Sequence, residues 1–121
     1  MKFINSKAHG VLDYLTVIFL VLSPTLFHMS GVLETFTYGL AVVHLLLTIC
    51  TRFELGIIKV LPFKVHGIIE VCVAVLLTGV ALWFNDAGNF LGFYFYLWLA
   101  LVIMVVFLCT NFTAPVQRLA P

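Results

Sequence analysis

Two similar heptapeptides, KAHGVLD near the N-terminus and KVHGIIE in the middle of the chain, each place a histidine four residues before a carboxylate. The pairs are His9 with Asp13 and His66 with Glu70. Residues four apart lie on one face of a helix, so each imidazole and its carboxylate would lie side by side. Imidazoles and carboxylates exchange protons and bind metal ions in proteins. These two pairs are therefore the first candidates for a functional site.

The rest of the chain is too apolar for a soluble protein. Of its 121 residues, 64% are hydrophobic and only 9% are charged, whereas soluble domains have about 25% charged residues. The chain cannot cover itself with a polar surface, so its solvent must be lipid. A net charge of +1 without a basic face excludes nucleic acid as a partner.

The spacing of the charged residues predicts membrane-spanning helices. Lys, Arg, Asp and Glu are absent from residues 14–33, 35–51, 71–85 and 87–117. A spanning helix needs about 20 mostly apolar residues. The sequence therefore predicts an all-α integral membrane four-helix bundle, with helices over residues 8–28, 35–52, 65–84 and 90–111. Pro24 is expected to bend or end the first of them.

The basic residues predict how the chain is oriented. In a four-pass topology all of them fall on one side: Lys2, Lys7, Arg52, Lys59, Lys64 and Arg118. The loops on the other side hold only Glu34 and Asp86. Positively charged loops stay in the cytoplasm, so both termini are expected to be cytoplasmic.

The two heptapeptides belong to a longer internal repeat. CTRFELGIIKVLP, residues 50–62, aligns without gaps on CTNFTAPVQRLAP, residues 109–121, and the two segments share Cys, Thr, Phe and the final Pro. We interpret residues 1–63 as a first transmembrane hairpin repeat with a cytoplasmic linker, and residues 64–121 as a second hairpin repeat with a C-terminal tail. Two such copies form a parallel internal repeat about an axis along the membrane normal. The linker is expected to be a short amphipathic helix or a turn at the membrane surface.

This repeat predicts a polar cluster inside the membrane. Its axis sets His9 against His66, and Asp13 against Glu70, roughly 9 Å inside the cytoplasmic edge by helical rise. A carboxylate in lipid must find a partner, and the nearest candidate is the histidine on its own helix. Such a group exchanges protons as a unit.

Further residues are expected at the same end of the bundle. His44 on the second predicted helix lies about 12 Å inside the same edge by helical rise, so it joins the predicted cluster. Gly10 and Gly67 would let the first and third helices approach closely.

Three interpretations of the cluster remain open. The pairs could be structural, satisfying buried groups and fixing helix register. They could form a proton or ion path, with Asp13, Glu70 and His44 as relay or coordinating groups. They could hold a metal or haem, although the bundle motif for bridged metals is Glu-x-x-His and not the spacing found here. We predict no catalytic residue, no metal and no cofactor, because the chain has no nucleophile with a base, no phosphate-binding loop and no zincin helix.

The run HGVLDYLTVIFLVLSP, residues 9–24, resembles the repeat of the small SPW-repeat membrane proteins. Ser23 and Pro24 match that motif, with Thr25 in the place of the tryptophan, and the second copy keeps His66 and Glu70. The resemblance implies duplicated hairpins in the bacterial inner membrane and brings no established activity.

We therefore expect a small structural or accessory protein of the bacterial inner membrane that is not an enzyme. The alternative is a small proton- or ion-conducting transport protein that uses the polar cluster. The expected partners are the lipid bilayer and either further copies of the chain or a larger membrane assembly.

Overall fold

The computed structural model describes residues 2–113, and within this range the chain forms four α-helices and one pair of two-residue strands. The elements are α1 (Ser6–Leu26), α2 (Gly31–Ile49), β1 (Thr51–Arg52), β2 (Leu61–Pro62), α3 (Phe63–Asp86) and α4 (Phe90–Cys109). Each of the helices α1 to α4 is long and apolar enough to cross a membrane. The prediction of an all-helical chain with the build of a multi-pass membrane protein is confirmed to this extent.

The predicted helix ranges overlap α1 to α4, with differences at the ends. The largest difference is at the start of α2, which begins at Gly31 and not at residue 35. The first turn of α2 therefore includes Glu34. A carboxylate is stabilised there by the unpaired N–H groups of the helix N-terminus. Pro24 lies inside α1, and the helix continues past it for only two residues to Leu26. Arg118 and the rest of residues 114–121 lie outside the described residues, so that part of the predicted second repeat has no structural account.

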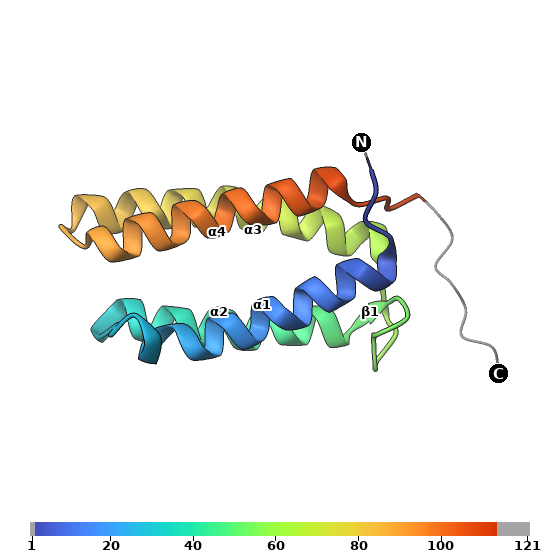
Figure 1. Ribbon diagram of the computed structural model, residues 1–121, viewed down its shortest axis with the longest axis horizontal. Coiled ribbons are helices and arrows are strands. Elements are labelled where there is room, and N and C mark those ends of the chain that lie inside the picture. The colour runs from blue at the N-terminus through green and yellow to red at the C-terminus, as the bar shows by residue number, and fades with distance from the viewer. Residues whose placement is uncertain (1, 114–121) are drawn as a thin grey trace.

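The helices are arranged as two antiparallel pairs. α1 packs along α2 and α3 packs along α4, and these contacts far exceed those between the pairs. Figure 1 shows the N-terminus and the β1 loop at one end of the molecule and the two helix-connecting turns at the other. We call the former the polar end and the latter the turn end. That the two helix pairs are copies of one duplicated unit stays a prediction.

Local signals define the ends of the helices. The Asn5 side chain accepts a hydrogen bond of 2.8 Å from the Ala8 N–H and so caps α1. The Asn89 side chain caps α4 by accepting one of 3.0 Å from the Gly92 N–H. Both bonds satisfy donors that a helix N-terminus leaves unpaired. Gly88, with a φ of 78°, makes the sharp turn between α3 and α4.

The linker between the helix pairs is a loop and not an amphipathic helix, so that form of the prediction is wrong. β1 and β2 pair in parallel, with Thr51 opposite Leu61, and the Leu61 N–H donates a hydrogen bond of 2.8 Å to the Cys50 carbonyl. The chain folds back tightly at Gly56, where a Cβ atom would overlap the Thr51 carbonyl oxygen. A helix over residues 53–63 would break both contacts.

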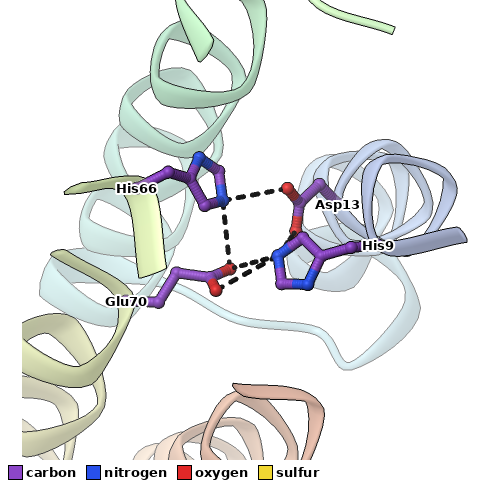
Figure 2. A group of neighbouring side chains, drawn as sticks. All are labelled: His9, Asp13, His66 and Glu70. Atoms are coloured by element: carbon purple, nitrogen blue, oxygen red, sulfur yellow. Dashed lines mark hydrogen bonds and ion pairs between the residues drawn. The ribbon is translucent and has the colours of Figure 1, made fainter. Parts of the chain in front are cut away.

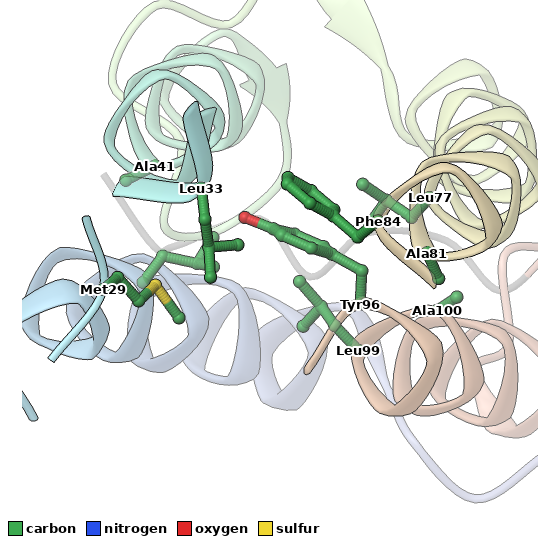
Figure 3. Close-up of a cluster of buried hydrophobic side chains, with 10 residues drawn as sticks. Met29, Leu33, Ala41, Leu77, Ala81, Phe84, Tyr96, Leu99 and Ala100 are labelled. Carbon is green, nitrogen blue, oxygen red and sulfur yellow. The ribbon is translucent and has the colours of Figure 1, made fainter. Parts of the chain in front are cut away.

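An apolar core fills the half of the molecule nearer the turn end, and its centre is Tyr96 (Figure 3). The Tyr96 ring is fully buried, lies edge-on to Phe36 and stacks on Phe84. Its hydroxyl lies 2.6 Å from Thr37 Oγ1, and the Thr37 hydroxyl donates its own hydrogen to the Leu33 carbonyl at 2.7 Å. Tyr96 is therefore the donor of a hydrogen bond that ties α4 to α2 across the two helix pairs.

Large apolar side chains cover the outside of the helices. Leu76, Trp98 and Leu26 are 67%, 64% and 62% exposed, and many Val, Leu and Ile side chains resemble them. An exposed apolar surface of this extent is expected on a protein whose surroundings are lipid chains.

Replacing Tyr96 by Phe is expected to lower the free energy of unfolding by about 0.6–1.7 kcal/mol, the range for hydrogen bonds between membrane helices. The ring and its packing stay, so only the bond to Thr37 is lost. Denaturation of the purified protein in mixed detergent micelles measures the change. The matched control is Tyr94→Phe, because Tyr94 is 60% exposed. Equal effects of the two substitutions would contradict the assignment.

Candidate functional site

The structure brings the five predicted residues together at the polar end. They are His9 and Asp13 on α1, His44 on α2, and His66 and Glu70 on α3, and we call them the polar cluster. Figure 2 shows the four from α1 and α3 pointing at one another. Both of these histidines are fully buried, and the two carboxylate residues are only 4% exposed. Buried ionisable groups require partners, and here they find them in each other.

The shortest contacts cross between the helix pairs. His9 Nε2 lies 3.1 Å from Glu70 Oε2 but 3.4 Å from Asp13 Oδ1 on its own helix. His66 Nε2 lies 3.1 Å from Asp13 Oδ2 and 3.4 Å from Glu70 Oε1. The prediction that the histidine on the same helix is the nearest partner is therefore wrong. Side chains four residues apart on one helix point in the same direction. Side chains on two facing helices point toward each other, so their polar ends can come closer together.

His44 approaches the cluster from α2. Its Nε2 atom lies 3.7 Å from Asp13 Oδ1. This nitrogen has no hydrogen-bond partner among the described residues. The residue is only 9% exposed. The structure thus places His44 beside the predicted pairs, with a buried nitrogen that faces a carboxylate at longer than hydrogen-bond distance.

Two threonines fix which nitrogen of each main imidazole carries hydrogen. Thr51 Oγ1 donates to the Leu47 carbonyl at 2.6 Å and lies 2.8 Å from His66 Nδ1. Thr110 Oγ1 donates to the Val106 carbonyl at 2.6 Å and lies 2.9 Å from His9 Nδ1. A hydroxyl has one hydrogen to donate, so each threonine must accept from its histidine. Both Nδ1 atoms therefore carry hydrogen, and both Nε2 atoms face the carboxylates.

The segments that carry these threonines make equivalent contacts. The Leu61 N–H donates to the Cys50 carbonyl at 2.8 Å, and the Ile4 N–H donates to the Cys109 carbonyl at 2.9 Å. Each contact starts a short parallel pairing, of Thr51 with Leu61 in one case and of Thr110 with Ile4 in the other. Each threonine is held directly after the end of a helix and next to the start of another.

Aromatic rings close the cluster where glycines leave room. A Cβ atom at Gly10 would overlap the Phe53 ring, and one at Gly67 would lie 2.7 Å from Phe112 Cε1. The glycines therefore accommodate rings from the loops, and the prediction that they let α1 and α3 approach is wrong. The buried Phe63 ring also lies edge-on to His9, with the ring centroids 5.4 Å apart. Together these rings exclude water from the imidazoles.

The sequence reasoning did not assign site roles to four of these residues: Thr51, Phe53, Thr110 and Phe112. Their signal was the shared Cys-Thr-x-Phe of the two aligned segments, which we used only as a mark of the repeat. A buried hydrogen bond of 2.8 Å from the Ser6 hydroxyl to Glu54 Oε1 joins the start of α1 to the linker, and no pattern in the sequence indicated it.

The geometry allows two kinds of chemistry. Imidazoles and carboxylates that alternate at 3.1–3.4 Å can balance one another's charge, which suits a site buried in an apolar region. The same four side chains offer ligand atoms that all lie within 4.8 Å of one another, so they could hold a metal ion.

Comparison of the chain with protein-family models, with curated protein sequences and with solved structures finds no match. The geometry of the site is therefore the basis for its interpretation.

Replacing Gly10 or Gly67 by Ala is expected to lower the melting temperature of the protein in detergent, because the added methyl displaces a phenylalanine ring from the cluster. The matched controls are Gly39→Ala in α2 and Gly79→Ala in α3, where nothing lies within 4 Å of the new Cβ atom. These controls should be neutral or stabilise the helix by up to about 1 kcal/mol. Equal behaviour of all four variants would count against the role given to the rings.

Proposed function

We propose that the chain is a small structural or accessory membrane protein in which the polar cluster joins two helix pairs. The observation that carries this proposal is that each carboxylate lies closest to the histidine of the other helix pair. The carboxylate of Asp13 on α1 lies 3.1 Å from His66 on α3, and the carboxylate of Glu70 on α3 lies 3.1 Å from His9 on α1.

These ion pairs join α1 to α3, two helices whose backbones approach each other at few positions. An unpaired carboxylate inside a membrane is unfavourable by at least about 2.5–3.5 kcal/mol. Separating the helix pairs would shift each carboxylate from a cross-pair histidine to the more distant one on its own helix. The cluster therefore specifies both the partner and the register of α1 against α3.

We further propose that the polar end faces the cytoplasm and that the membrane is the bacterial inner membrane. Lys2, Lys7, Arg52, Lys59 and Lys64 are exposed and belong to the polar end, whereas Asp86 is exposed at the turn end. This distribution supports cytoplasmic termini. The resemblance to SPW-repeat proteins supports the bacterial membrane, and the equivalent contacts of Thr51 and Thr110 support an internal duplication.

The described residues give less support to proton or ion conduction. Three of the hollows on their surface are apolar or lie at the turn end, and no residue of the polar cluster lines these three. One apolar hollow of about 500 Å³ lies between α1 and α4 and is lined by residues such as Leu12, Phe19 and Trp98. A conduction path would need a polar hollow that reaches Asp13 or Glu70.

A double-mutant cycle tests the joining role. His9→Gln and Glu70→Gln are each expected to destabilise the protein, and their effects should be coupled by about 1–3 kcal/mol, because they remove one shared interaction. Denaturation in mixed micelles gives the four stabilities. Glu34→Gln replaces Glu70→Gln in the control cycle, since Glu34 lies in the first turn of α2 at the turn end.

Additive effects of His9→Gln and Glu70→Gln would contradict the proposal. Conduction is checked with purified protein in liposomes that contain a pH-sensitive dye. We expect the proton flux to equal that of protein-free liposomes. A flux that the combined Asp13→Asn and Glu70→Gln substitutions abolish would instead identify a transport protein.

A further inference from the structure

We propose that the polar cluster is a binding site for one divalent transition-metal ion of the size of Zn²⁺. The ligands are the Nε2 atoms of His9 and His66 and one carboxylate oxygen each from Asp13 and Glu70. The inference rests on the proposed function, because the ion would join the two helix pairs through the side chains that join them as ion pairs.

The spacing of the ligand atoms is close to that of a metal site. A tetrahedral ion with bonds of about 2.0–2.1 Å holds neighbouring ligands about 3.3–3.4 Å apart. The nitrogen–oxygen contacts around the cluster are 3.1, 3.4, 3.1 and 3.4 Å long, and each carboxylate uses both of its oxygens in them. Every imidazole thus has a carboxylate on each side. One ligand atom from each of the four residues lies within 4.8 Å of the other three, and side-chain rotation would draw these atoms to the spacing that an ion requires.

The imidazoles are held with their Nε2 atoms free to coordinate. Thr51 and Thr110 each accept the Nδ1 hydrogen of a histidine, at 2.8 and 2.9 Å. This leaves Nε2 as the coordinating nitrogen and holds the ring plane in place. Histidines that bind metals typically donate their other N–H to such a partner, and loss of that partner lowers metal affinity about 10–100-fold.

Several buried polar atoms converge on the centre of the cluster with only one another as partners. Asp13 Oδ2, His66 Nε2 and Glu70 Oε2 make ion-pair contacts of 3.1–3.4 Å within the cluster, but among the described residues none of them has a hydrogen bond of good geometry. His44 Nε2 is also buried without a hydrogen bond there, 3.7 Å from Asp13 Oδ1. A coordinated ion would satisfy atoms arranged in this way.

The charge balance also fits a divalent ion. Two neutral imidazoles that keep their hydrogen on Nδ1 and two ionised carboxylates carry a charge of −2 together, which a divalent ion would cancel. Neutrality matters because the site lies within helices that are apolar enough to cross a membrane.

The ligand types indicate which ions would bind. Imidazole nitrogen suits Zn²⁺, Co²⁺, Fe²⁺ and Ni²⁺, whereas Mg²⁺ and Ca²⁺ prefer oxygen ligands. Two nitrogens and two oxygens that all come from buried side chains favour Zn²⁺ among the common ions. The ligands come from two helices, and the His-x-x-x-Asp/Glu spacing within each helix differs from the Glu-x-x-His motif of carboxylate-bridged bundles.

The experiment uses the full chain in detergent after treatment with a chelator. Titration with Zn²⁺ alone is expected to give one bound ion per chain and a higher melting temperature, while Mg²⁺ should do neither. Co²⁺ should give the intense visible absorption of a tetrahedral site. The combined Asp13→Asn and Glu70→Gln substitutions should lower the Zn²⁺ affinity at least 100-fold, and the control variant His28→Gln should leave it unchanged, since His28 lies in the turn after α1.

Folding defects are controlled by Thr51→Val and Thr110→Val, which keep all four ligands. Each should weaken Zn²⁺ binding 10–100-fold and shift the Co²⁺ spectrum. Absence of binding to the native chain, or native affinity in the combined variant, would overturn the proposal. If Zn²⁺ does not bind but His9 and Glu70 remain energetically coupled, the metal site fails and the joining role stands. If Zn²⁺ binds without that coupling, the joining role by ion pairs fails and the metal site stands.

Discussion

The fold depends on one constraint: ionisable groups that leave water must meet partners of opposite charge. Asp13 and Glu70 lie on helices that are long and apolar enough to cross a membrane, and each is only 4% exposed. The closest partner of each is a histidine on the other of these two helices. The constraint therefore fixes the relative height of α1 and α3, since a slip by one residue along either helix would separate both pairs.

Other features of the polar end follow from this contact. An imidazole needs its second nitrogen satisfied, and Thr51 and Thr110 supply an acceptor directly after the ends of two helices. The helix-breaking loops must then return to the cluster, where rings such as Phe53 lie against glycine and exclude water. At the turn end the helix pairs are joined by a different contact, a hydrogen bond from the Tyr96 hydroxyl to Thr37 within an apolar core. Two chemically distinct contacts thus hold the helix pairs together at their two ends.

The sequence predicted the helices well because their signal is composition, which needs no knowledge of neighbours. It also predicted the members of the cluster, since His9 and His66 each precede a carboxylate at helical spacing. It failed on the partners, because a pattern along one helix cannot show which side chain faces it from another. The loop between β1 and β2 was missed for a related reason: its shape is set by a hydrogen bond between Leu61 and Cys50 that has no local signature.

The central claim is that each carboxylate is partnered across the helix pairs. Solid-state NMR of the protein in lipid bilayers tests it most directly, by measuring through-space contacts between labelled imidazole nitrogens and carboxylate carbons. We predict that His9 Nε2 shows its strongest contact with the Glu70 carboxylate, and His66 Nε2 with that of Asp13. Contacts confined to the carboxylate on the same helix, or carboxylates in contact with lipid chains, would contradict the account.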